Sequence, residues 1–266
     1  MKSRLTALGL LCAGAVGAAL RVWALKTAYE PLTKLAIPGA ASLTALILYA
    51  IAVPLLALAG SLWLRRDALA GNHTLYSGLS RPMSALGAAA AAVLTAGSFL
   101  RLMDNASLAA GGGGKSALSS AVVDGLMLAA GLCMLWMSLG GQRISEMCHD
   151  SILPLAPGFA GCLALVVYYQ NNSRDPGVTH YCWILLCLMA SVLALYHQAG
   201  YAFDNPHPVR AQWATLTAGA YALLALPDAD SPGELLLLLG AAGWMFQRSI
   251  LIAQGGEEDS AAQTDE

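Results

Sequence analysis

Residues 40–64 read AASLTALILYAIAVPLLALAGSLWL and contain no charged side chain. An α-helix rises about 1.5 Å per residue, so an apolar run of this length spans the roughly 30 Å hydrocarbon core of a bilayer. Lipid offers the backbone no hydrogen-bond partner, and the run lacks the alternation of a transmembrane β-strand. The run therefore predicts a membrane-spanning helix.

The rest of the chain repeats this pattern. Its 266 residues are 57% hydrophobic and only 11% charged, whereas about a quarter of a soluble domain is charged. Apolar blocks between charged or Pro/Gly breaks predict an all-α fold, a polytopic transmembrane helical bundle of about eight spans. The expected helices are Leu5–Leu25, Ala40–Leu64, Met83–Met103, Ala117–Gly140, Leu153–Gln170, Tyr181–Phe203, Ala211–Leu226 and Gly233–Ala253.

Proline positions support these boundaries, because most prolines lie in connections or first turns, where a missing N–H costs little. Pro54 is the exception and predicts a kink in its helix. The last two helices are joined only by Asp228–Pro232, so they form either a tight hairpin or a re-entrant element. Residues 1–253 are expected to form one transmembrane domain, and residues 254–266 an acidic disordered tail.

Basic residues predict the orientation in the membrane. The arginine-containing connection Arg65–Arg81 favours the side on which both termini lie, so both are expected in the cytoplasm. Lys2 and Arg4 before an apolar run also resemble a secretory signal. The run continues to Arg21, which favours an uncleaved first helix. The alanine-rich composition and the short connections between the predicted helices indicate a bacterial plasma membrane.

Asp124 is the carboxylate that lies deepest inside a predicted helix. Charged groups at membrane depth are costly and normally have partners. Ser120, Asp124, Gly131 and Ser138 fall at helical spacing, so this face is expected to meet the bundle interior or a wet cavity.

Counting depth along the helices nominates partners for Asp124. Arg21 and Arg101 both lie towards the same membrane surface, and an Asp124–Arg21 ion pair is feasible. Two interpretations stay open: a structural pair that holds two helices together, or a ligand or ion site.

A second group of candidates lies towards the opposite surface. His197 shares a helix face with Tyr201, four residues further on, and Arg248 is expected at a depth similar to that of His197. These groups either line a pocket or, for the histidine, make an interfacial hydrogen bond. The run Tyr168–Asn172 is interpreted as an aromatic belt and polar exit, with a functional rim as the alternative.

Several familiar sites are not expected. Ala109–Ser116 reads AAGGGGKS, which resembles a phosphate-binding loop, but its flanks are membrane helices and not a strand in a soluble domain. No nucleotide is therefore expected at Lys115, and Gly111–Gly114 is interpreted as a flexible linker. The six cysteines lack CxxC spacing and a paired histidine cluster, so no metal is expected. No basic surface for nucleic acid is present.

The absence of a paired-glutamate, histidine-rich or GxSG motif disfavours an enzyme, and no catalytic residue or cofactor is assigned. The favoured hypothesis is a small transporter or membrane-embedded ligand-binding component, because such proteins hold solutes with buried polar groups on irregular helices. Besides the lipid bilayer, its expected partner is a small molecule or ion. The alternative is a non-enzymatic scaffold, assembly or sensor subunit that binds a partner membrane protein.

Overall fold

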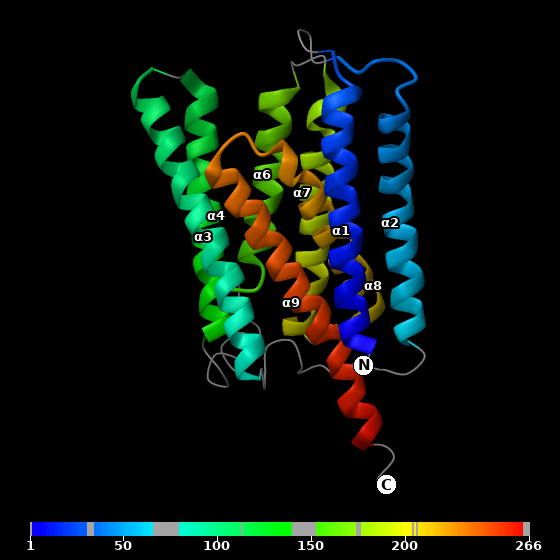
Figure 1. Ribbon diagram of the computed structural model, residues 1–266. Coiled ribbons are helices and arrows are strands. Elements are labelled where there is room, and N and C mark those ends of the chain that lie inside the picture. The colour runs from blue at the N-terminus through cyan, green and yellow to red at the C-terminus, as the bar shows by residue number, and fades with distance from the viewer. Residues whose placement is uncertain are drawn as a thin grey trace.

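Eight α-helices make up most of the described part of the chain in a computed structural model (Figure 1). The structure describes residues 2–30, 35–65, 80–112, 114–139, 153–173, 177–203, 205 and 207–262. The helices are α1 (Lys2–Thr27), α2 (Ala41–Arg65), α3 (Arg81–Ala110), α4 (Gly114–Leu139), α6 (Ala156–Asn172), α7 (Val178–Ala199), α8 (Pro208–Ala225) and α9 (Pro232–Ala262). Two short 3₁₀ turns, η1 (Gly200–Phe203) and η2 (Leu226–Asp228), follow α7 and α8. The N- and C-terminal ends lie at the same end of the bundle (Figure 1).

The predicted all-α bundle is confirmed, and every predicted helix is present. Within the described residues, six helices are long and apolar enough to cross a membrane, namely α1, α2, α3, α4, α7 and α9, so the protein is a multi-pass membrane protein. The largest differences are at helix ends: α3 continues to Ala110 and α9 to Ala262. The proposed division between residues 1–253 and 254–266 stays a prediction.

Helix α8 is the central helix of the bundle, packed by α1, α2, α7 and α9. Its 18 residues are buried on almost every side, including the polar Gln212, Thr215 and Thr217. This explains its weak signal in the sequence, because a helix surrounded by protein needs no lipid-compatible surface. Helices α8 and α9 form a tight hairpin through η2.

Helix α2 continues through Pro54, and α8 supplies hydrogen bonds at this irregularity. Proline lacks an N–H, so it leaves the carbonyl of Ala50 without its helical donor. The Tyr221 hydroxyl donates to that carbonyl at 2.5 Å. The Trp213 indole N–H donates to the Pro54 carbonyl at 2.9 Å. These bonds fix α8 against α2, while the predicted kink itself stays a prediction.

Glycines bring α3 and α9 into backbone contact. A Cβ atom at Gly97 would lie 2.5 Å from the backbone nitrogen of Leu237, and one at Gly240 would lie 2.5 Å from that of Leu94. Small residues allow this close packing between membrane helices. At the start of α9, Gly233 lies against the Arg101 side chain. The crossing therefore places Arg101 beside the first turn of α9.

Candidate functional site

Asp124 of α4 is 2% exposed and is held by two side chains of α3. The Arg101 Nε lies 3.2 Å from Asp124 Oδ1, and the Asn105 amide donates to Asp124 Oδ2 at 2.6 Å. Arg101 and Asn105 are one helical turn apart, so both reach the same carboxylate. The predicted α4 face is confirmed as interior, because Ser138 is also buried and Gly131 packs against α3.

Glu234 in the first turn of α9 supplies a second carboxylate. The Arg101 Nη1 lies 3.2 Å from Glu234 Oε1, while Glu234 Oε2 accepts a hydrogen bond from the backbone N–H of Asp230 at 3.2 Å. The Glu234 N–H donates to the Ser231 hydroxyl at 3.2 Å, which caps the helix. One guanidinium thus bridges two carboxylates, and we call Arg101, Asp124 and Glu234 the charged cluster.

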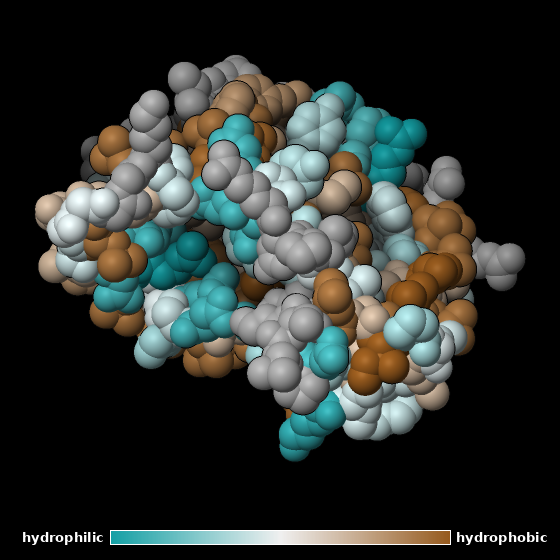
Figure 2. Space-filling view, turned by 90° about the horizontal axis from the view of Figure 1, so that it is seen from above, coloured by the Kyte–Doolittle hydropathy of each residue, from teal (hydrophilic) through white to brown (hydrophobic). Residues whose placement is uncertain are grey.

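A cavity of about 70 Å³ adjoins the charged cluster. Its polar lining includes Ser120, Tyr168 and Asn171, and α7 contributes the apolar Ile184 and Leu188. Hydrophilic side chains border a hollow on this end of the molecule (Figure 2). A void needs about 10–15 Å³ to hold a water, whereas drug-sized ligands occupy about 300–1,000 Å³. The cavity therefore has room for a few waters or an ion.

The charges of this cluster do not balance. Asp124 and Glu234 carry two negative charges when ionised, and Arg101 carries one positive charge. An uncompensated charge at membrane depth is costly. The cluster is neutral only when a carboxyl group holds a proton or when a cation occupies the cavity.

Arg21 does not pair with Asp124, so the predicted Asp124–Arg21 pair is wrong. The Arg21 Nε lies 2.9 Å from both carboxylate oxygens of Asp228, and its Nη2 lies 2.7 Å from Oδ1. Its Nη1 donates to the Tyr29 hydroxyl, which donates in turn to the Thr179 carbonyl, each at 2.8 Å. The observed partner of Arg21 differs from the predicted one because α1 packs against α2, α8 and α9.

The candidates at the opposite end come from three elements. His197 of α7 is half-buried and meets the Tyr196 ring edge-on. Tyr201 lies in η1, packed with Ala211 and Ile252. The Arg248 guanidinium of α9 lies 4.2 Å from the centre of the Trp244 ring. A shared pocket for His197, Tyr201 and Arg248 stays a prediction.

Sequence analysis missed a buried amide network near these residues. The Gln198 side chain of α7 donates to the Thr215 hydroxyl of α8 at 3.0 Å. Its amide oxygen accepts from the Trp244 indole of α9 at 3.2 Å. The network ties together the three helices at the centre of the bundle.

Three residues that contact Asp124, Arg101 or Arg21 were also not predicted, namely Asn105, Asp228 and Glu234. Asp228 and Glu234 flank a short connection, where carboxylates are ordinarily solvated. One signal was available for Glu234, because Ser231 three residues earlier gives the S-x-x-E pattern of a capped helix start. Asn105 lies in the last part of α3, beyond the predicted helix end at Met103.

Most described residues of the stretch that resembles a phosphate-binding loop belong to the end of α3 or the start of α4. Gly111 and Gly112 make the turn after α3, and Gly112 adopts a φ of 92°. The residues before them are helical, so the strand that a phosphate-binding loop requires is replaced by α3. The Lys115 side chain lies outside the described part. Among the described residues, no group of three His, Cys, Asp or Glu side chains is placed to hold a metal.

Comparisons with known proteins add nothing to this description of the site. No family model, curated protein or solved structure matches the chain.

Proposed function

We propose that the protein is a small membrane transporter or membrane-embedded ligand-binding component whose site is the charged cluster. The ligand we propose is a singly charged cation, either a proton or a small monovalent metal ion. The observation that carries this proposal is the pairing of two carboxylates with one guanidinium beside a cavity of about 70 Å³.

The charged cluster can bind a cation while its existing ion pairs and hydrogen bonds stay in place. An ionised carboxylate has about four lone-pair positions, and Arg101 and Asn105 each take one position on Asp124. Ser120 and Asn171 line the same cavity. Their oxygen atoms each accept one hydrogen bond, from the Asn171 amide and the Ser116 hydroxyl, and keep a further lone pair that suits a small hard cation. Arg101 supplies a permanent internal counter-charge, so the site binds a monovalent ion without an excess of positive charge.

The proposal places the protein in a plasma membrane with both termini in the cytoplasm. Both chain ends lie at one end of the bundle (Figure 1), and the charged cluster lies near the other, beside the first turn of α9. In this orientation the cavity is close to the outer surface. A protease-cleavable tag after residue 266 tests the orientation, because it must resist protease added outside intact cells.

The first test is the thermal stability of the purified protein with and without sodium, potassium or lithium ions, at several pH values. A ligand at 100 times its dissociation constant stabilises the folded state by about 2.7 kcal/mol. We expect stabilisation by at least one cation that is lost in Asp124→Asn and in Glu234→Gln. The control is Asp104→Asn, an exposed carboxylate on the same helix as Arg101, which is expected to retain it.

Transport itself is tested in proteoliposomes that contain a pH-sensitive dye or, in parallel samples, a dye that is sensitive to the stabilising cation. We expect an imposed gradient of the stabilising cation to move protons or the cation in the wild type and in Asp104→Asn, but not in Asp124→Asn. Binding without flux would support a ligand-binding component. A wild type whose stability and flux respond neither to a cation nor to pH would reject the proposed site and favour a scaffold or assembly subunit.

A further inference from the structure

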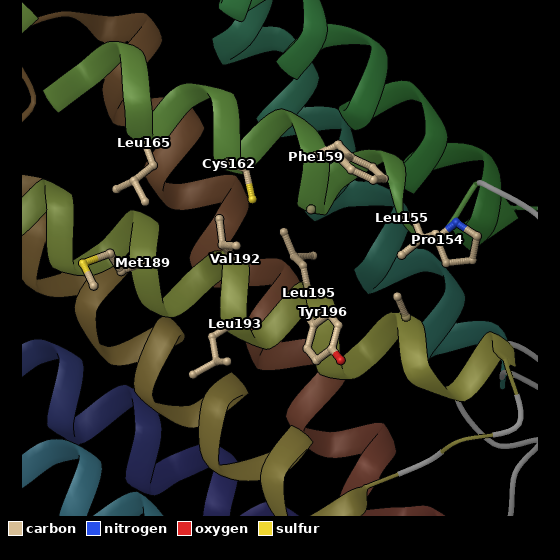
Figure 3. Close-up of a pocket in the computed structure, with 12 residues that line it drawn as sticks. Pro154, Leu155, Phe159, Cys162, Leu165, Met189, Val192, Leu193, Leu195 and Tyr196 are labelled. Atoms are coloured by element: carbon tan, nitrogen blue, oxygen red, sulfur yellow. The ribbon is translucent and has the colours of Figure 1, made fainter. Parts of the chain in front are cut away.

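An apolar groove of about 500 Å³ runs between α6 and α7. Figure 3 shows Phe159, Cys162 and Leu165 of α6 on one side and Met189, Val192 and Tyr196 of α7 on the other. Its lining is almost entirely carbon and sulfur, and it is separate from the cavity of the charged cluster. The groove therefore offers shape and apolar contact but almost no hydrogen bonds.

The groove is continuous with the lipid-facing surface of the protein. Its α7 wall belongs to the membrane span Tyr181–Phe203. Large apolar side chains at its edge are exposed in the described structure, with Phe159 at 64% and Met189 at 56%. Because these residues lie at membrane depth, the medium that meets the groove is lipid hydrocarbon.

The short length of α6 helps to explain why the groove exists. Its 17 residues give a length of about 26 Å, less than the roughly 30 Å hydrocarbon core. The helix begins after Pro154, and its first turns present the small residues Gly158 and Cys162 to the groove. A Cβ atom at Gly158 would meet no atom within 4 Å, so the space at this position is open.

We infer that this groove holds one acyl chain of a membrane phospholipid. A helix is about 10 Å in diameter, so a partner helix would lie over a groove between two neighbouring helices and not within it. A single hydrocarbon chain is far thinner and matches an apolar lining. Tyr196 lies near the end of α7 with its ring exposed, where its hydroxyl can meet the polar part of the lipid.

Photo-crosslinking of the full-length protein tests this inference. The probe is a phospholipid with a diazirine on one acyl chain, present as a small fraction of phosphatidylethanolamine and phosphatidylglycerol vesicles. We expect adducts to be several-fold more frequent on the groove segments around Cys162 and Met189 than on the lipid-facing segment of α1 around Cys12. Cys12 is a useful reference because its side chain is also exposed.

A matched pair of variants separates the groove from general lipid contact. Gly158→Trp fills the groove and is expected to reduce its adducts several-fold, whereas Gly60→Trp on α2, where a Cβ atom also meets open space, leaves them unchanged. If Gly158→Trp fails to fold, Gly158→Leu serves the same purpose. Adducts spread evenly over the lipid-facing helices would overturn the inference. Cys162–Cys162 crosslinks between copies in place of lipid adducts would also overturn it.

Discussion

Arg21 and Arg101 are both arginines near the same end of a membrane bundle, yet their surroundings differ in charge balance and in access. Arg21 is fully buried and pairs with the Asp228 carboxylate. Arg101 has a 25% exposed side chain and divides its guanidinium between Asp124 and Glu234. The Arg21–Asp228 pair is one-to-one in charge and buried, whereas the charged cluster has two carboxylates for one guanidinium and lies beside a cavity.

The two arginines also connect different parts of the fold. Arg21 links α1 to η2, and through Tyr29 to the start of α7. Tyr29 and Trp183 place their rings within 5.3 and 5.7 Å of its guanidinium carbon. Arg101 links α3, α4 and α9 around an open space. Under the proposed function the Arg21 pair is structural and the charged cluster binds the ligand, and the following predictions test this division.

The largest expected effect is on folding, from Arg21→Met. The change removes the guanidinium that pairs with the buried Asp228 carboxylate, and breaking a buried ion pair in this way costs about 3–5 kcal/mol. Equilibrium unfolding in detergent measures the loss. The double variant Arg21→Met with Asp228→Leu removes both charges and is expected to recover most of it. A loss below about 1 kcal/mol for the single variant would contradict the structural assignment.

The next effect is expected at the α3–α9 crossing, which places Arg101 beside Glu234. In Gly240→Val the new side chain would meet the Leu94 backbone, where even a Cβ atom lies at 2.5 Å. Overpacking of this kind costs about 1–3 kcal/mol. The same unfolding assay should show a much smaller change for Gly60→Val, which faces open space. Equal effects in the two variants would show that the close crossing does not matter.

A smaller effect is expected for Tyr221→Phe, which removes a sealed polar contact without changing charge. The variant leaves the Ala50 carbonyl opposite Pro54 without the hydroxyl donor. Side-chain hydrogen bonds between membrane helices contribute about 0.6–1.7 kcal/mol. Thermal unfolding against Tyr196→Phe, whose ring is exposed, isolates the contribution. The prediction fails if both variants unfold at the wild-type temperature.

The smallest effect on stability is expected for Asp124→Asn. Asparagine can still accept from Asn105, and Arg101 keeps one carboxylate, Glu234, so the cluster becomes neutral. We expect a change of less than about 1 kcal/mol, below the cost of breaking a buried pair. A loss as large as that of Arg21→Met in parallel unfolding experiments would make Asp124 a structural residue.

The helices could be predicted from the sequence because each apolar block must satisfy its own backbone in lipid. The burial of Asp124 followed from the same reasoning, since its polar neighbours recur at helical spacing. The ion-pair partner of Asp124 could not be predicted in this way. Depth along a helix is one coordinate, and Arg21 and Arg101 have similar depth. Only the lateral packing of helices places Arg101 beside α4 and Arg21 beside η2.

The remaining site residues depend on tertiary contacts that composition does not encode. Glu234 reads as an ordinary first-turn carboxylate, and it enters the cluster because Gly233 and Gly97 allow α3 and α9 to touch. Helix α8 was the weakest prediction because hydropathy measures contact with lipid, and this helix contacts protein on almost every side.

The central claim is that the charged cluster takes up a single positive charge, and infrared difference spectroscopy tests it most directly. Without added sodium or potassium, near neutral pH, the wild type should show the carbonyl stretch of a protonated carboxyl group. Addition of the stabilising cation should remove this band. The band should be absent from Asp124→Asn and Glu234→Gln and present in Asp104→Asn. A wild type without the band and without a cation response, or a band unchanged in the two cluster variants, would contradict the claim.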